Sequence, residues 1–72
     1  MFMKEIVLNN MLELRTAKAL TQEDLAKVLE VSRQTVIAIE KGNYVPSVLL
    51  AMKIARFFKK PVESIFNIKK VT

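Results

Sequence analysis

Hydrophobic and polar residues along this chain follow the period of amphipathic helices. Apolar side chains recur every three or four positions through most of the sequence, which places them on one face of an α-helix. Short polar segments separate these stretches. The pattern predicts helices at about residues 10–18, 21–29, 32–40, 47–58 and 61–66.

Capping residues mark where these helices begin. The first four are preceded by residues whose side-chain oxygens can accept a hydrogen bond from an unpaired helix N–H, namely Asn10, Thr21, Ser32 and Ser47. Glu13 follows Asn10 by three positions and Asp24 follows Thr21 likewise, which is the spacing of a capping box. The fifth helix is expected to begin at Pro61, whose fixed φ suits a first helical position.

The two ends of the chain have a composition typical of strands. Residues 5–8 and 65–71 are rich in β-branched side chains, and apolar and polar residues alternate from Phe66 to Val71. We expect the two ends to pair as a short antiparallel sheet; the alternative is chain ends without regular structure. The expected fold is all-α with five helices, to which the two-stranded sheet is added where the ends pair.

Length, net charge and residue composition limit the classes of function that this chain can have. A length of 72 residues predicts a single domain over residues 1–72, and a hydrophobic fraction of 51% argues against disorder. Twelve Lys and Arg against seven Asp and Glu give a net charge of +5, which attracts polyanions and makes nucleic acid the leading class of partner. The sequence has no Cys and no His, so disulfides, thiolate nucleophiles, imidazole bases and the main zinc ligands are excluded.

Catalysis and membrane association find little support. The acidic residues are scattered and offer no evident carboxylate pair for metal-assisted hydrolysis, so we expect no enzyme, no cofactor and no metal site, and no small-molecule ligand is evident. The longest apolar run, residues 48–52, is far shorter than the roughly 20 residues that span a bilayer. The first residues lack the features of a signal peptide. We therefore expect a cytoplasmic protein with no membrane partner.

Residues 22–41 carry the most informative pattern. Two short predicted helices stand close together there, and the small residue Ala26 lies where they must approach each other. On a helical wheel Val36 and Ile39 share the inner side of the second helix. The outer side is polar, small and basic and carries Gln34, Ala38 and Lys41. Such a face fits a groove.

The chain resembles the Cro and phage-repressor type of helix-turn-helix regulator, also called the xenobiotic-response-element family. The resemblance runs from about Leu12 to Phe66 and rests on residues 20–26 (LTQEDLA), 31–36 (VSRQTV), 39–42 (IEKG) and 46–47 (PS). It implies a lambda-repressor-like DNA-binding domain with the helix at 32–40 in the major groove of double-stranded DNA. It further implies a sequence-specific transcriptional regulator, most simply a repressor that binds a pseudo-palindromic operator as a homodimer.

The resemblance also suggests which residues touch bases. Arg33, Gln34 and Ala38 occupy base-contacting positions, and the chemistry agrees, since Arg pairs with guanine and Gln with adenine. Ala38 and the neighbouring Ile37 could pack on thymine methyl groups. The alternative for Ile37 is a contact with the core or with another subunit.

Other residues are candidates for phosphate contacts. Gln22 matches the family position that holds a phosphate at the start of a helix, although it could simply be a polar residue there. Around the recognition helix, further candidates are Ser32, Thr35, Lys41, Asn43 and Tyr44. Ser32 would cap its helix with or without DNA, and Tyr44 could instead pack its ring over the core.

Two further positions bear on the stability of the motif. The resemblance places a buried ion pair between Arg15 and Glu40; the alternative is two solvated charges. Glu30 stands where the family usually has Gly, so if the backbone there is left-handed, the residue is strained.

The predicted helix at 47–58 is apolar on nearly all sides and must be covered. We expect a homodimer whose interface combines the last two helices with the C-terminal strand; the alternative is a monomer core. A protein-interaction module of the same fold, such as an antitoxin or a bridging factor, remains the other functional hypothesis. Salt separates the two, because phosphate binding weakens as the ionic strength rises.

Overall fold

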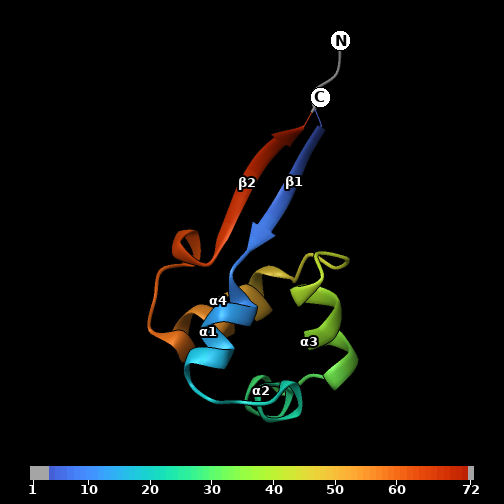
Figure 1. Ribbon diagram of the computed structural model, residues 1–72. Helices are drawn as coiled ribbons and strands as arrows, with labels where there is room; N and C mark the ends of the chain where they lie inside the picture. The colour runs from blue at the N-terminus through green and yellow to red at the C-terminus, as the bar shows by residue number, and fades with distance from the viewer. Residues whose placement is uncertain (1–3, 72) are drawn as a thin grey trace.

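A two-stranded ribbon projects from a body of helices in the computed structural model, which describes residues 4–71 (Figure 1). The expectation about a signal peptide at the first three residues lies outside this range. The elements along the chain are β1 (Lys4–Asn9), α1 (Met11–Ala17), α2 (Gln22–Leu29), α3 (Arg33–Glu40), α4 (Val48–Phe58), a 3-10 turn (Val62–Ser64) and β2 (Phe66–Val71). The described chain is elongated, with extents of 43 × 23 × 22 Å.

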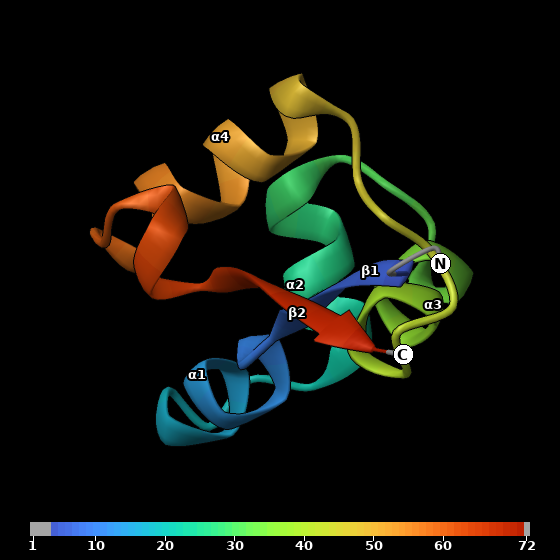
Figure 2. The ribbon, with the colours of Figure 1, turned by 90° about the horizontal axis from the view of Figure 1, so that it is seen from above.

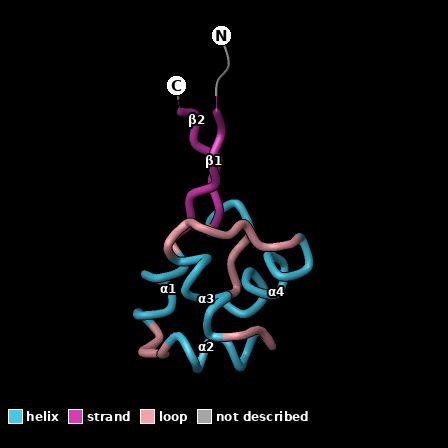
Figure 3. Tube along the Cα trace, turned by 90° about the vertical axis from the view of Figure 1, so that its right-hand side faces the viewer, coloured by secondary structure: helices cyan, strands magenta, loops and turns pink. Residues whose placement is uncertain are grey.

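The ribbon joins the two ends of the chain. β1 and β2 pair antiparallel, from Lys4 opposite Val71 to Asn9 opposite Phe66. The predicted two-stranded sheet is therefore confirmed. Figure 3 shows the ribbon standing away from the helices, and apolar side chains on it are exposed to solvent, among them Ile6, Leu8 and Ile68.

The four helices lie around the base of the ribbon and enclose the core (Figure 2). The most extensive contact between two helices is that of α2 with α3. The fully buried large side chains come from every helix and from the residue directly before β2, and they are Met11, Leu25, Leu29, Val36, Ile39, Ile54 and Ile65. None of the helices within residues 4–71 is long and apolar enough to cross a membrane.

Three of the predicted caps are present. The Thr21 hydroxyl accepts a hydrogen bond from the backbone N–H of Asp24, and the Asp24 carboxylate accepts one from the N–H of Thr21, both at 3.0 Å. This is the capping box expected at the start of α2. Ser32 and Ser47 accept from the backbone three residues later in the same way.

Asn10 stands at the predicted N-cap position of the first helix, but its side chain makes no capping hydrogen bond, so the prediction of a capping box with Glu13 is wrong. The Oδ1 of Asn9, and not that of Asn10, accepts a hydrogen bond from the backbone N–H of Met11 at 3.0 Å. The amide of Asn10 instead donates to the carbonyl of Ser64. The contact of Asn10 with Ser64 lies across 54 residues, so the local sequence pattern could not reveal it.

The prediction of a fifth α-helix at residues 61–66 is also wrong. Residues 62–64 form a single 3-10 turn, closed by hydrogen bonds from Ser64 to Pro61 and from Ile65 to Val62. Only four residues separate Pro61 from the first residue of β2, which leaves no length for repeated α-helical turns. The described chain has four α-helices.

Candidate nucleic-acid interface

Helix α3 lies at the edge of the body, directly after α2 (Figure 1). A turn of only three residues, 30–32, joins the two helices. α3 begins where Ser32 caps its first backbone N–H groups, and the extended backbone of Ser32 sets its direction. Two short helices in this arrangement form a helix-turn-helix.

The two sides of α3 differ sharply in burial. Val36 and Ile39 are fully buried against α2 and the rest of the core, whereas Arg33 and Gln34 are exposed at the N-terminal end. The first turn of α3 therefore presents a guanidinium and a primary amide to solvent. Both groups can bond to two atoms of a base edge at once.

Ile37 and Ala38 lie on the flanks of α3 and are half-buried. Each keeps part of its apolar surface accessible beside the exposed polar residues. Ile37 therefore combines contacts within the protein with an accessible apolar surface. Its partial burial reflects its place on the flank of α3, between the buried side and the exposed side of the helix.

Ser32 and Thr35 are engaged with each other. The Ser32 hydroxyl accepts from the Thr35 backbone N–H at 3.1 Å, and the two hydroxyl oxygens lie 3.0 Å apart. Only one of the two hydroxyl hydrogens is used between them. The other can donate to an acceptor outside the protein.

The loop after α3 carries the remaining polar candidates. Lys41, Asn43 and Tyr44 are all exposed, and 46% of the Tyr44 surface is accessible. Lys41 is the C-cap of α3, and Gly42 follows it with φ +79, a conformation that suits glycine. The loop thus turns away from the helix directly beside its C-terminal end.

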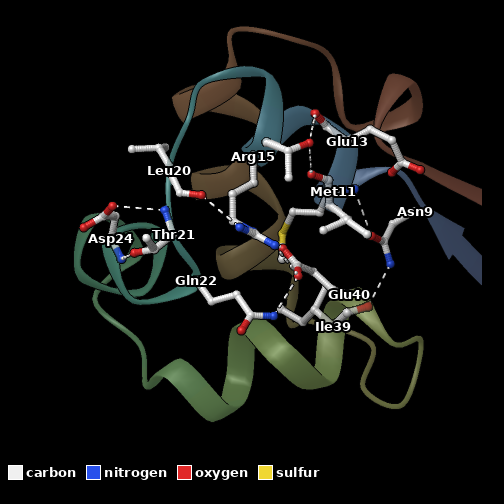
Figure 4. Close-up of polar contacts among 12 residues, drawn as sticks. Asn9, Met11, Glu13, Arg15, Leu20, Thr21, Gln22, Asp24, Ile39 and Glu40 are labelled. Atoms are coloured by element: carbon white, nitrogen blue, oxygen red, sulfur yellow. Dashed lines mark hydrogen bonds and ion pairs between the residues drawn. The ribbon is translucent and has the colours of Figure 1, made fainter.

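Arg15 and Glu40 form an ion pair that reaches from α1 to the last turn of α3 (Figure 4). Their side chains are only 11% and 5% exposed. Arg15 also donates to the carbonyl of Leu20 at 2.8 Å, so it holds the loop between α1 and α2 as well. The hydrogen bond to the Glu40 carboxylate raises the pKa of Arg15 above its ordinary value.

Gln22, the predicted phosphate ligand on α2, has a structural contact that the sequence did not indicate. Its Nε2 donates to Oε1 of Glu40 at 3.0 Å, beside the ion pair (Figure 4). One N–H and the carbonyl oxygen of this amide remain for other partners. The contact lies across 18 residues, which explains why local sequence patterns could not reveal it.

An open groove of about 780 Å³ surrounds the start of α2. Arg15, Gln22 and Arg33 line it together with the acidic residues Glu23 and Asp24. The Asp24 carboxylate serves the capping box, and Glu23 lies 3.8 Å from the ammonium of Lys27. The groove brings the α2 start and Arg33 of α3 to one surface.

A second contact that the sequence did not indicate supports the turn between α2 and α3. Nζ of Lys53, on α4, donates to the carbonyl of Leu29 at 3.2 Å and to Oε1 of Glu30 at 3.0 Å. The Lys53 ammonium holds the pKa of the Glu30 carboxyl below its ordinary value. The only signal in the sequence was the departure from glycine at position 30.

Metal ligands do not gather in this region. Across residues 4–71 the structure shows no group of three or more His, Cys, Asp or Glu side chains that could hold a metal ion.

Known proteins resemble this chain over most of its length. The family model described as helix-turn-helix matches residues 11–65. An uncharacterized HTH-type transcriptional regulator of Methanocaldococcus jannaschii is 65% identical over 52 residues, which cover 72% of this chain and 79% of that protein. The uncharacterized HTH-type transcriptional regulator YgzD of Bacillus subtilis is 50% identical over 58 residues, or 81% of this chain and 88% of YgzD.

A solved structure shares the fold. The crystal structure of the restriction-modification controller protein C.AhdI from Aeromonas hydrophila superposes with a TM-score of 0.68 at 33% identity. The match covers 75% of this chain and 82% of that chain.

Proposed function

The chain belongs to the helix-turn-helix family of transcriptional regulators, and on that premise we propose that it recognises specific DNA sequences with α3 in the major groove. One observation carries the proposal. Arg33 and Gln34 are exposed on the first turn of a helix whose opposite side is buried in the core. A rigid helix with exposed donors and acceptors at its N-terminal end can read base edges.

Within this proposal each exposed or half-buried residue of α3 contacts a different part of a base. Arg33 pairs with O6 and N7 of a guanine, and Gln34 with N6 and N7 of an adenine. Ile37 and Ala38 pack their accessible apolar atoms against thymine methyl groups.

Contacts to the DNA backbone would come from around α3. The phosphate ligands we propose are Gln22, Ser32, Thr35, Lys41, Asn43 and Tyr44. Gln22 offers its free amide N–H, and the Ser32–Thr35 pair offers one hydroxyl hydrogen. The net charge of +5 adds a sequence-independent attraction to DNA.

We propose that the chain acts as a homodimer. A ridge of apolar side chains at the start of α4, formed by Val45, Val48, Leu49 and Met52, is 59–77% exposed. A second copy would cover this ridge and the apolar residues of β2, of which Ile68 is 71% exposed. Two-fold symmetry would then present two α3 helices to half-sites about one turn of DNA apart, in a pseudo-palindromic operator. Bound across a promoter, such a dimer would act as a repressor.

Selection of bound fragments from random duplexes tests this proposal. We expect an enriched pseudo-palindrome, bound more tightly than random duplex at moderate salt. The logarithm of the affinity should fall linearly with the logarithm of the salt concentration. Light scattering during size-exclusion chromatography should give twice the mass of the 72-residue chain. Enrichment of no sequence would contradict the proposal. An apolar partner bound independently of salt would instead favour the protein-interaction module.

A further inference from the structure

The turn between α2 and α3 is built around a strained residue. Glu30 has φ 61 and ψ 42, the left-handed conformation that residues with a side chain rarely adopt. The backbone N–H of Val31 closes the end of α2 by donating to the carbonyl of Ala26 at 3.0 Å. The chain then enters α3 two residues later, so the torsion angles of Glu30 set the direction in which α3 leaves α2.

Lys53, on α4, holds this turn by hydrogen bonds from its ammonium group. Its ammonium donates both to the last carbonyl of α2, that of Leu29, and to the carboxylate of Glu30. A cation at the C-terminal end of a helix also interacts favourably with the helix dipole. Only 26% of the Lys53 side chain is exposed, so its stem is packed and its ammonium is directed to this place.

We infer that Lys53 is a positioning residue, which fixes the orientation of α3 relative to α2 and so supports discrimination between DNA sequences. The inference rests on the proposed function only in its second part, because the orientation of α3 is a property of the free protein. Lys53, on α4, bonds to two groups at the strained residue: the carbonyl of Leu29, which precedes it, and the side chain of Glu30 itself. Reading of bases tolerates displacements of only about 0.5 Å or 10–20° in the side chains that do it.

A merely stabilising role makes a different prediction. The Glu30 carboxylate is 78% exposed, and an exposed ion pair contributes little to stability. Lower stability would reduce the folded fraction and weaken binding to all DNA equally. A change in the angle of α3 would weaken binding to the selected sequence more than binding to random duplex.

Three variants separate these roles. Lys53→Met keeps the length of the side chain and removes the ammonium, whereas Lys53→Arg keeps the positive charge. Arg56→Met removes the other cation of α4, which takes part in neither contact with the turn. Residual dipolar couplings of the amides of α2 and α3 in the free protein report the angle between the helices. Titrations with the selected and random duplexes give the ratio of affinities.

We expect Lys53→Met, which loses both hydrogen bonds, to change the couplings of α3 relative to α2 and to lower the ratio of affinities by roughly two- to tenfold. Lys53→Arg and Arg56→Met should retain both. Unchanged couplings in Lys53→Met would overturn the inference that Lys53 orients α3, and an equal loss of affinity for both duplexes would overturn its role in discrimination. If Lys53→Met does not fold, Lys53→Gln, which removes the ammonium and has a shorter side chain, takes its place with the same outcomes.

The couplings also separate this inference from the proposed function. Absence of discrimination by the unaltered protein would refute sequence reading by α3. A change in the couplings of Lys53→Met would still establish that Lys53 orients the helix, and unchanged couplings would refute that as well.

Discussion

The side chains of Arg15 and Glu40, 25 residues apart, form a bidentate ion pair. Nε of Arg15 donates to Oε2 at 2.6 Å and Nη2 donates to Oε1 at 3.1 Å. Glu40 is the last residue of α3, so the pair ties the end of the proposed recognition helix to α1. Removal of either partner would leave a charge in a largely buried place.

Replacement of Arg15 by Met should lower the free energy of unfolding by about 3 kcal/mol, the lower end for buried pairs because both side chains keep some solvent contact. Urea unfolding measures the change. The double variant Arg15→Met and Glu40→Met removes both charges and should recover part of the loss. A loss below about 0.5 kcal/mol in the single variant would show that the two charges are effectively solvated.

The protein should become less stable in acid, because protonation of Asp24 weakens the capping box of α2. The hydrogen bond donated by the Thr21 backbone holds the pKa of Asp24 below its ordinary value of 3.8. A lowered folded-state pKa means that the stabilisation is complete above about 3.8 and is lost as the pH falls through the lower, folded-state value. Thermal unfolding from pH 7 to pH 2 measures this. Asp24→Asn should be less stable at pH 7 and lose less on acidification; an acid response equal to that of the unaltered protein would contradict the assignment.

Glycine at position 59 should stabilise the protein. Lys59 ends α4 with φ 56, where a residue with a side chain is strained. Lys59→Gly relieves that strain but adds freedom to the unfolded chain, so we expect a net gain of roughly 0.5 to 1 kcal/mol in chemical denaturation. Lys60→Gly, outside the left-handed region, should give no gain. Equal effects of the two variants would show that the strain at Lys59 is negligible.

The contact between α2 and α3 should not tolerate a larger residue at position 26. Ala26 is only 3% exposed and belongs to the core, so Ala26→Leu would force the two helices apart at a cost of about 1 to 3 kcal/mol. Thermal unfolding measures the cost. Ala17→Leu, which adds the same atoms at an exposed position of α1, should change stability little. A stable Ala26→Leu variant would mean that the helices are less closely packed than the structure shows.

Replacement of Arg33 should affect specificity and not only affinity. Arg33→Ala is expected to cost about 1 to 3 kcal/mol at the selected site and to relax preference at one base pair. Gln22→Ala should instead weaken binding to all sequences alike. Arg56→Ala removes a cation from α4 and serves as the control for net charge. Equal losses on selected and random duplexes for Arg33→Ala would remove Arg33 from base reading.

Local signals in the sequence predicted the helices well. The periodicity of apolar residues located all four α-helices to within a residue or two, and the capping box at Thr21 and Asp24 formed as expected. These features involve neighbours three or four positions apart, so the sequence displays them directly. The alternation in residues 66–71 likewise predicted a strand.

The predictions from sequence were wrong where a distant part of the chain bonds to the same residues. β2 takes up the chain from Phe66 onward and reduces the last predicted helix to a 3-10 turn. At the start of α1, the Asn10 side chain donates to the carbonyl of Ser64, 54 residues away, and makes no capping hydrogen bond. Both outcomes depend on partners at the opposite end of the chain.

The amino-acid sequence thus determined by itself the family of the chain, its helices and the residues available on α3, because periodicity, caps and motif spacing are local properties. Folding in three dimensions settled how those residues are held. Gln22 bonds to Glu40, and Lys53 bonds across the turn at Glu30. These contacts join positions 18 and 23 residues apart, and a pattern along the chain carries no information about which distant side chains will meet.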